Sequence, residues 1–529
     1  MKKIAAIIIS VFAPLAVMAQ NAMDTYQVSM TQIKGTARYV SMGGAFTALG
    51  GDMSSISQNP AGIGVYRNSE FTFSLGGQWN RNTSAGAPTA KNGVFTFDNV
   101  GIVGTFNTGS PKGLLSYNIG ITYNRNNSFN RKYNGTVGNL GASFTNYLEN
   151  VTRGIPSGDL VVVPDFDAYY DTNSPWLSIL GYQSYLFAPY TDNGTDYYGL
   201  FNPGVSSGSS YTTIREDGRN DEYTINFGGN VNDRVYFGAA LGIKDLSFTR
   251  RVDYEEDLYN TEGRYESDNN NISSSNYLFS TYYRMRGTGF NGKFGVIVRA
   301  SDFLRLGATI HTPTYYSVDQ TMDASIDNRL ALNDGTNKTV SQTIPTYVTN
   351  TIRMQTPWNF QVGAAYIIGK KGILSVDYQY TAYNSMKLKE TNGDGFPIEN
   401  AFYKAQFKAG NTVKVGAEYR LTKSVSLRAG YAIQLSPLKS ELKDVNAEVP
   451  TVGMQTAYFL PGNASYYSCG IGYRFASFYF DASYQHFIQK SDMFAYSPLF
   501  FDDRAPLIPG SSQIKSKQNA INFTVGMRF

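Results

Sequence analysis

Two histidines and one cysteine are the only residues of their kinds in this chain of 529 residues. An activated serine or cysteine nucleophile needs a base beside it, and that base is usually histidine. His311 and His486 lie far apart and Cys469 stands alone, so neither a metal-ligand spacing nor a disulfide framework is present. No Gly-x-Ser-x-Gly motif links a strand to a helix. We therefore expect no enzyme activity, no cofactor and no metal.

The overall charge gives no sign of a nucleic-acid partner. The formal net charge is only +4, and no block of lysine or arginine marks a basic binding surface. The chain instead has 40 Tyr, 33 Phe and 52 Gly against 19 Pro. Abundant tyrosine and phenylalanine suit β-strands and the aromatic girdles of membrane barrels.

The first residues have the composition of an export signal. Lys2 and Lys3 precede an apolar run over residues 4–18, and Ala19 provides a small-residue cleavage site before Gln20. This predicts a signal peptide over residues 1–19. The rest of the sequence has no apolar stretch near eighteen residues, the length of a transmembrane helix. A closed β-barrel is the other structure that can cross a bilayer.

Apolar and polar residues alternate with a period of two in several segments, which predicts β-strands. These strands would position any side chain in the lumen. In residues 521–529 apolar side chains alternate with small or polar ones, and residues 413–420 and 425–433 repeat the pattern. Lipid outside and water inside impose this alternation on a barrel wall. The chain therefore reads as all-β, a transmembrane antiparallel barrel.

The spacing of turns predicts about fourteen strands, an even number as in bacterial barrels. Six tight connections join consecutive strand pairs, near residues 110–112, 232–233, 301–302, 370–371, 422–423 and 476–477. An opening strand near residues 70–79 and a closing one at residues 519–529 complete the barrel over residues 69–529. Long polar loops separate the pairs on the other side, the largest over residues 125–221, with a short amphipathic helix within residues 139–151. Such loops can cap a pore mouth, bind a partner or pack on themselves.

The same alternation assigns charged residues to the lumen. Leu304 and Leu306 face lipid, which turns His311 inward; a charge facing lipid near the midplane would cost about 2–4 kcal/mol. The inward phase near the turns also contains a basic belt, formed by Arg299, Arg305, Arg420, Arg428, Arg474 and Arg528. These arginines either receive a ligand carboxylate or pair with lumenal acids such as Asp377, Glu418, Asp481 and Asp52.

Residues 20–68 lack the strand pattern. They contain Gly43-Gly44-Ala45-Phe46, then Asp52, then Asn59-Pro60-Ala61-Gly62. Small residues permit tight turns and close backbone packing. A barrel of about fourteen strands leaves an aqueous channel unless something fills it. We expect this segment to plug the lumen or to lie in the periplasm.

With these motifs, the sequence resembles the FadL-type family of outer-membrane transporters for long-chain fatty acids and aromatic hydrocarbons. Further carriers of the resemblance are residues 304–309, residues 427–431 with Pro437, and the terminal Phe529. The likeness covers both ends and several middle strands, but not the long outer loops. It implies a fourteen-stranded barrel and a lumenal hatch that carries Asn59-Pro60-Ala61. It also implies diffusion of apolar ligands towards an opening in the wall at a kinked early strand, for which Gly120 is the candidate.

The resemblance predicts a monomeric outer-membrane channel that takes up small hydrophobic molecules by passive diffusion past the hatch. Its partners would be the hydrophobic ligand, outer-membrane lipid and, through Phe529, the barrel-assembly machinery. Two alternatives stay open. A barrel of this kind could be a docking shuttle for secreted proteins, or it could be a general porin whose flux is indifferent to hydrophobicity.

Overall fold

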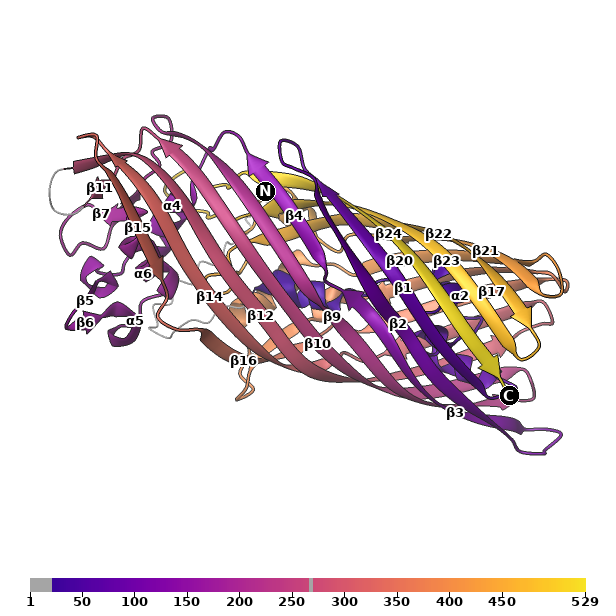
Figure 1. The fold of residues 1–529 in the computed structure, drawn as a ribbon. Coiled ribbons are helices and arrows are strands. Elements are labelled where there is room, and N and C mark those ends of the chain that lie inside the picture. Colours follow the sequence, from indigo (N-terminus) through magenta and orange to yellow (C-terminus); the bar gives the residue numbers. More distant parts are fainter. Residues whose placement is uncertain (1–20, 266–269) are drawn as a thin grey trace, which may run out of the picture.

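Strand residues alternate between the two faces of one antiparallel sheet that closes on itself (Figure 1). The computed structural model describes residues 21–265 and 270–529; the expected signal peptide lies outside them. The first wall strand, β1 (Glu70–Thr83), pairs with β2 (Ala90–Asn107) and with the last strand, β24 (Ser511–Arg528). This pairing leaves no sheet edge open to lipid, where unpaired backbone groups would be costly.

The described part of the chain forms fourteen wall strands, as predicted. After β1 and β2 come β3 (Leu114–Ser128), β9 (Ser207–Val231), β10 (Val235–Tyr259) and β12 (Asn270–Arg299). The next three are each in two pieces: β13 (Leu304–His311) with β14 (Tyr315–Leu332), β16 (Val348–Gln355) with β17 (Asn359–Ile368), and β18 (Gly372–Thr381) with β19 (Lys387–Glu390). The last are β20 (Gly410–Arg420), β21 (Val425–Gln434), β22 (Tyr458–Phe475), β23 (Phe478–Phe494) and β24.

All six predicted tight connections join neighbouring strands at one end of the barrel, called the turn end below. Between β9 and β10, Asn232 and Asp233 both have φ of 56°, the left-handed conformation that two-residue hairpin turns require. The C-terminus lies at the same end (Figure 1).

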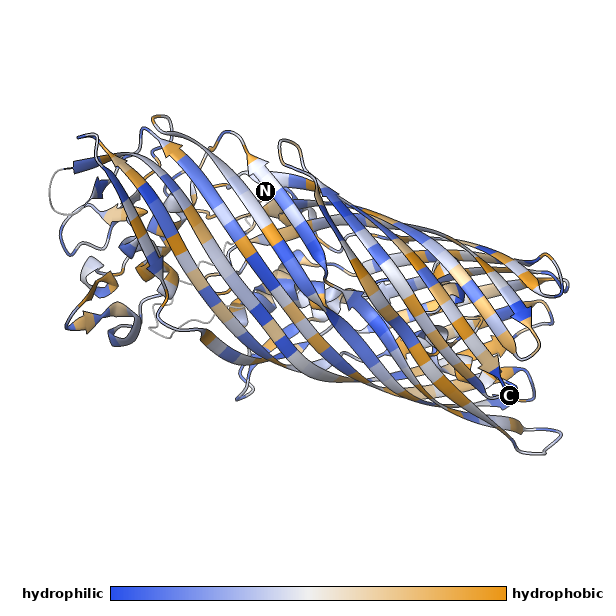
Figure 2. Ribbon diagram, in the orientation of Figure 1, coloured by the Kyte–Doolittle hydropathy of each residue, from blue (hydrophilic) through white to orange (hydrophobic). Residues whose placement is uncertain are grey.

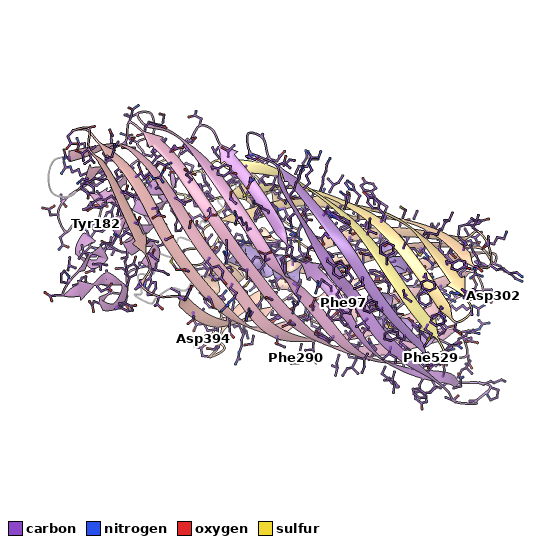
Figure 3. The ribbon with its side chains drawn as sticks, viewed as in Figure 1. Phe97, Tyr182, Phe290, Asp302, Asp394 and Phe529 are labelled. Carbon is purple, nitrogen blue, oxygen red and sulfur yellow. The ribbon has the colours of Figure 1, made fainter. Side chains whose placement is uncertain are left out.

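The outer surface near the turn end carries the apolar band that a bilayer requires (Figure 2). On β12, Phe294 is 57% exposed, whereas its neighbour Lys293 is 4% exposed and faces the lumen. Phe290 stands on the same outer face (Figure 3). Within the described ranges, no helix is long and apolar enough to span a membrane.

Several strands continue far beyond this band, which corrects the predicted loop boundaries. A tilted strand crosses the bilayer in about 9–11 residues, but β9 and β10 each have 25 and β12 has 30. The expected loop over residues 125–221 is therefore shorter, because β3 runs to Ser128 and β9 begins at Ser207. On β10 the polarity of the two faces is exchanged beyond Lys244. Apolar side chains such as Phe248 and Tyr254 now face inward, and Arg251 on the outer face is in water. Because the outer face of these strand ends is polar, their sequence resembles that of a loop.

The remaining elements form a cap and rim at the end opposite the turns (Figure 1). Between β3 and β9 lie β4 (Arg131–Val137), α4 (Phe144–Thr152), η2 (Ser157–Leu160), β5 (Val162–Val163), β6 (Phe166–Asp167), α5 (Ala168–Asp171), α6 (Trp176–Gln183), β7 (Phe187–Pro189) and β8 (Tyr197–Gly199). Later pieces are β11 (Arg264–Tyr265), β15 (Asn337–Thr343), η3 (Tyr383–Ser385), α7 (Pro397–Gln406) and α8 (Ser440–Lys443). The helix expected within residues 139–151 is α4.

The carboxylate of Glu256 on β10 fastens the cap to the wall. It accepts hydrogen bonds from the Ser143 hydroxyl (2.5 Å) and the Phe144 amide (3.0 Å) at the start of α4. It also accepts bonds from the hydroxyls of Tyr277 (2.6 Å) and Tyr254. Glu256 is fully buried, and such a group is stable only when its acceptor sites are filled.

Candidate functional site

Residues 21–66, which we call the lumenal segment, run down the inside of the barrel. They comprise α1 (Ala22–Ser29), α2 (Ala37–Ser41), α3 (Met53–Gln58) and η1 (Pro60–Val65). At the outer end, Asp24 of α1 forms an ion pair of 2.8 Å with Arg250, on the part of β10 beyond the apolar band. Near the turn end, the Asn118 side chain on β3 donates to the Tyr66 carbonyl at 3.3 Å. The segment therefore follows the channel axis.

Side-chain caps set the helices of this segment. Asp52 begins α3 by accepting from the amides of Ser54 (3.0 Å) and Ser55 (3.3 Å), and it also accepts from the Thr36 hydroxyl at 2.8 Å. Asn59 begins η1 by accepting from the Ala61 amide at 3.0 Å, with Pro60 as the first helical residue. These are the usual roles of aspartate and asparagine at helix starts and of proline at the first position.

The two glycine pairs permit the sharp reversals between the helices. Gly43 and Gly44 have φ of 62° and 70°, and Gly50 and Gly51 have 60° and 63°, a region that disfavours residues with a side chain. Phe46 between the pairs is fully buried, with the Arg38 guanidinium 5.2 Å from its ring centre. Ala45, Ala61 and Gly62 are buried as well.

A ring of wall glycines receives the lumenal segment. A Cβ atom on any of ten inward-facing glycines would come within 1.9–3.0 Å of an atom of the segment. They are Gly101, Gly120, Gly228, Gly238, Gly295, Gly307, Gly363, Gly416, Gly430 and Gly470. Gly238 opposes both Gly228 and Gly295, Gly307 opposes Gly363, and Gly416 opposes Gly430. The segment therefore packs directly on wall backbone.

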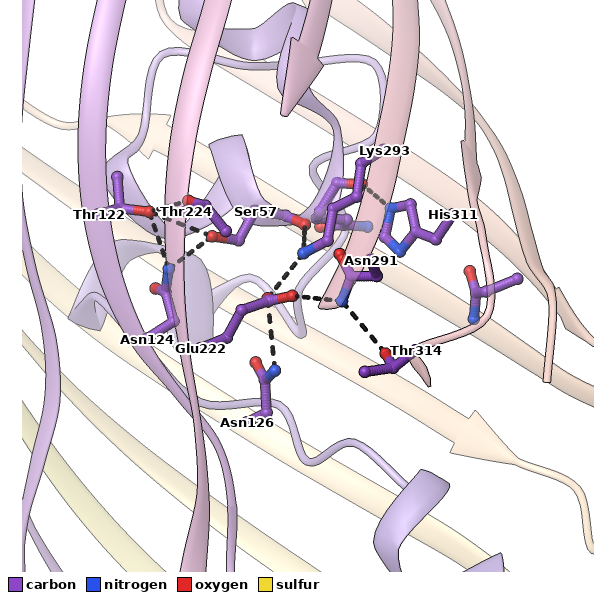
Figure 4. Close-up of polar contacts among 12 residues, drawn as sticks. Ser57, Thr122, Asn124, Asn126, Glu222, Thr224, Asn291, Lys293, His311 and Thr314 are labelled. Carbon is purple, nitrogen blue, oxygen red and sulfur yellow. Dashed lines mark hydrogen bonds and ion pairs between the residues drawn. The ribbon is translucent and has the colours of Figure 1, made fainter. Parts of the chain in front are cut away.

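Polar side chains tie α3 to the wall above this ring. The Ser57 hydroxyl accepts from the Asn124 side chain at 2.5 Å and lies 3.3 Å from the Thr122 hydroxyl (Figure 4). The Lys293 ammonium donates to the Ser57 carbonyl at 2.9 Å and to Glu222 at 2.6 Å. Side-chain hydrogen bonds and one buried ion pair, Lys293 with Glu222, therefore connect the end of α3 to β3, β9 and β12.

A second set of contacts involves Asp377 on β18. Its carboxylate accepts from the Thr47 amide and hydroxyl, both at 2.8 Å, and from the Gln58 amide at 3.1 Å. His311 faces the lumen, where Nε2 lies 2.7 Å from the Gln58 carbonyl oxygen. His486 instead lies on the outer face of β23, with Nδ1 2.7 Å from Asn519 Oδ1. Neither histidine has a nucleophile beside it in these contacts.

The expected basic belt is divided between paired and unpaired arginines at the turn end. Arg428 bonds Glu418 and Asp481, both at 2.6 Å, and Arg528 bonds Glu70 at 2.7 Å. Arg38 of α2 joins this network through Glu418 at 2.9 Å. Arg428 and Arg528 thus belong to a network of buried acids.

The other members of the belt differ in what they contact. Arg299 bonds Asp302 in the adjoining turn at 2.9 Å and is not among the residues that line the cavity beside the segment. Arg305 donates to the Leu49 carbonyl of the segment at 3.2 Å. Arg420 and Arg474 line the cavity without an ion pair to any described residue. This cavity, about 600 Å³, is the turn-end vestibule.

Two smaller cavities lie on the outer side of α3. One, of about 130 Å³, is polar and is lined by Glu222, four lysines and His311, among others; the lysines are Lys34, Lys244, Lys293 and Lys414. The other, of about 60 Å³, is the aromatic chamber beside α1. Its lining is mixed: polar residues, among them Arg131, Glu216 and Arg250, stand beside apolar or aromatic ones, which are Met23, Tyr26, Met30, Tyr133, Tyr458, Phe459, Pro461 and Phe487. Aromatic surface with polar groups beside it is found in many sites for small organic molecules.

The ladder of paired strands continues through Gly120, the candidate for a kink beside a wall opening. Gly120 pairs with Val103 on β2 and with Asn226 on β9 in unbroken register. Its missing side chain makes room for Ile63 of the lumenal segment instead. The wall is interrupted elsewhere, where Pro313 separates β13 from β14 and Pro357 separates β16 from β17. Proline cannot donate to a ladder, and this double proline break borders the polar outer cavity.

The sequence did not reveal the glycine ring or the contacts of Thr47, Gln58 and Glu222. Inward-phase glycines near the middle of successive strands are a usable signal for such a ring. In the described parts of the chain, no three His, Cys, Asp or Glu side chains are grouped to hold a metal ion.

Comparisons with known proteins agree with this architecture. The family model for outer membrane protein transport protein (OMPP1/FadL/TodX) matches residues 216–529. A solved Pseudomonas aeruginosa FadL homologue is 13% identical, with 94% of this chain and 99% of that chain covered and a TM-score of 0.53, which shows the shared fold. The Pseudomonas putida toluene transporter TodX (12% identical, TM-score 0.46) and the Ralstonia pickettii toluene transporter TbuX (14%, TM-score 0.45) align over 94% of this chain and 99% of theirs. No curated protein matches the sequence.

Proposed function

Because the chain belongs to the outer membrane protein transport protein family (OMPP1/FadL/TodX), whose members are outer-membrane channels for hydrophobic compounds, we propose that it admits small hydrophobic molecules by passive diffusion. Long-chain fatty acids and aromatic hydrocarbons are the substrate classes that we propose. In this proposal the lumenal segment is a hatch, and a ligand enters from the outer side and leaves past it.

The way in which the lumenal segment fills the barrel carries the proposal. Its residues line both the two outer cavities and the turn-end vestibule, and in this proposal the segment between them blocks the passage of solutes while it is in place. Yet the glycine ring offers no side chains that interlock with the segment, and the polar ties around Ser57 and Asp377 are hydrogen bonds. Contacts of this kind support movement of the segment without unfolding of the wall.

The aromatic chamber supports a ligand that has an aromatic or apolar part. Tyr26 and Met30 of the lumenal segment face Tyr133 and Phe487 of the wall side. A ligand bound there would touch α1 directly, so its binding energy could shift the segment. The chamber is small as it stands, and we expect it to widen when α1 moves.

The double proline break is where we expect a sideways exit from the polar outer cavity. Thr314 and Thr356 flank the break and remain joined by a hydrogen bond of 3.1 Å from the Thr356 amide to the Thr314 carbonyl. With fewer ladder bonds than the surrounding wall, this is where separation of two strands would cost least.

Uptake by intact cells tests the proposal. Host cells without a comparable channel would express the chain and receive a labelled fatty acid or naphthalene, while swelling of proteoliposomes would report the flux of a sugar of similar size. We expect faster uptake of the hydrophobic probe and little sugar flux. Equal acceleration of both would indicate a general porin. No acceleration of either, with a secreted protein bound to the purified barrel, would support the docking alternative.

A further inference from the structure

Five cations form an unpaired patch on the outer surface of the barrel, on four adjacent strands. They are Arg81 on β1, Lys91 on β2, Lys490 on β23, and Lys515 and Lys517 on β24. All five are exposed, and none forms an ion pair with a described residue. We call them the basic patch.

The strand register places these side chains next to one another. Arg81 lies directly opposite both Lys517 on one side and Lys91 on the other, so three cations form one row. In the next row outward, Lys490 lies opposite Lys515. Side chains that oppose each other directly in a sheet have Cβ atoms only about 4.5–5.5 Å apart, and like charges in such pairs repel. The fold therefore concentrates positive charge where none of the described residues provides a counter-ion.

Acidic residues do not compensate this charge. On the outer face of the same four strands near the patch, Asp492 is the one acid, and it opposes Gln513 rather than a cation. The outer face of β9, two strands along the wall from β2, is different: at a comparable distance from the turns, Arg219 pairs with Asp221 at 2.8 Å. The excess is thus a local feature of these strands.

The patch begins where the apolar band ends. The row below it contains Trp79, His486 and Asn519, which oppose one another across β1, β24 and β23. Trp79 is 50% exposed, and Phe95 and Phe523 continue the apolar surface towards the turn end. Exposed tryptophan marks the level of lipid headgroups. The cations lie one row farther out, at the depth of headgroup phosphates.

From this arrangement we propose that the basic patch binds the phosphate of a headgroup with net negative charge, on an outer-leaflet lipid. The Arg81 guanidinium can bond two phosphate oxygens at once, while the lysines act as point charges around it. The acyl chains of the same lipid would lie on Phe95 and Phe523. A bridging phosphate removes the repulsion between Arg81, Lys91 and Lys517, which a zwitterionic headgroup does less well.

Native mass spectrometry of the full chain in detergent tests this with two probes that share acyl chains, anionic phosphatidylglycerol and zwitterionic phosphatidylcholine. We expect the wild type to retain phosphatidylglycerol at concentrations at least about tenfold below those needed for phosphatidylcholine, and more weakly as salt rises. The variant Arg81→Gln/Lys515→Gln/Lys517→Gln should lose this preference. A control with the same charge change, Lys338→Gln/Lys404→Gln/Lys443→Gln, alters exposed lysines of the outer loops and should keep it.

Equal retention of the two lipids by the wild type, or equal behaviour of patch and control variants, would overturn the proposal. So would displacement of phosphatidylglycerol by an equimolar amount of inorganic phosphate, which would indicate a site for a free anion. Resistance of the folded barrel to dodecyl sulfate on unheated gels checks that each variant folds. Should the triple variant fail this check, Lys91→Gln/Lys490→Gln removes charge from both edges of the patch and should show the same loss in weaker form.

Discussion

The side-chain oxygen of Asn59 occupies the space into which a side chain at Gly295 would project. A Cβ atom on Gly295 would stand 1.9 Å from Asn59 Oδ1. The same asparagine donates to the Thr47 carbonyl at 2.7 Å and to the Val296 carbonyl at 3.4 Å. This pair therefore joins the lumenal segment to the backbone of β12.

Replacement of Gly295 by alanine should displace the lumenal segment. The added methyl group cannot fit without movement of Asn59, at a cost of about 1–3 kcal/mol by analogy with overpacked cores. We expect a higher basal conductance in planar bilayers, with the barrel still folded. Gly292→Ala on the same strand is the matched control, because its Cβ would meet nothing closer than 3.7 Å. Identical conductance of the two variants would argue against the close contact.

Two arginines of the basic belt should behave differently. Arg305→Ala removes the bond to the Leu49 carbonyl, a charged hydrogen bond of a kind that contributes about 1.5–3 kcal/mol, so leak of small solutes should rise. Arg420→Ala removes a charge that has no ion pair among the described residues and should leave leak unchanged while reducing anion selectivity. Liposome swelling and the reversal potential measure the two effects. Equal leak in both variants would contradict a docking role specific to Arg305.

Protonation of Asp52 at low pH should stabilise the lumenal segment in its place inside the barrel. Burial raises the pKa of this carboxyl from 3.8 to about 6, although Arg38 and the Thr36 hydroxyl oppose the shift. The folded state then binds the proton more tightly than the free chain. The stabilisation is fully present below about pH 4 and is lost as the pH rises through about 6, a difference of at most about 3 kcal/mol.

We therefore expect fewer channel openings at pH 4.5 than at pH 7.5 in single-channel recordings. Asp52→Asn should abolish most of this difference, because the asparagine amide does not titrate. The other acids of the turn-end vestibule are the same in both proteins, so they cannot account for a change between them. A pH response that survives the substitution unchanged would assign it to another group.

The cap should loosen when Glu256 is replaced by glutamine. An amide has one acceptor oxygen, so it cannot receive the bonds from Ser143, Phe144, Tyr254 and Tyr277 together. Loss of such bonds costs about 1–3 kcal/mol each when the partner stays buried. Limited proteolysis should cut residues 144–206 faster, whereas Glu255→Gln on the outer phase of the same strand should not change the rate. Equal rates would show that the cap is held elsewhere.

Much of the wall could be read from the sequence, because lipid forces every second residue to be apolar. The six turns and the pairing of the first wall strand with the last follow from that alternation and from the need to leave no open edge. The length of β9, β10 and β12 did not follow. Their outer parts stand in water, so Arg251 and Asp253 replace the apolar residues that mark a membrane strand.

The contacts inside the barrel were harder to predict because they depend on wall positions that have no side chain. Gly238, Gly295 and Gly307 have no side chain, so the strand pattern does not show that a segment packs on them. The arginines were assigned to the lumen from their phase, but phase could not tell that Arg299 turns to Asp302 or that Arg428 joins two acids. A glycine such as Gly120 can mark a bend in a strand, but the pattern does not show that its missing side chain makes room for Ile63.

The most direct test of the account locks the lumenal segment to the wall. The hydroxyls of Ser57 on α3 and Thr122 on β3 are 3.3 Å apart, so cysteines at both positions should form a disulfide. Cys469 is exposed and would be replaced by serine first. As a control, cysteines at Thr122 and Thr224, whose hydroxyls are 2.6 Å apart, join two wall strands and leave the segment unlinked; both variants lose the Thr122 hydroxyl that lies 3.3 Å from Ser57.

The measurement is uptake of a labelled hydrophobic probe by intact cells under oxidising and reducing conditions. If the segment is the hatch, oxidation of the Ser57→Cys/Thr122→Cys protein should lower uptake at least about tenfold, a change of about 1.4 kcal/mol in the opening equilibrium. Reduction should restore it, and the wall-to-wall control should be indifferent to both. Uptake that stays the same in the locked protein would contradict the account.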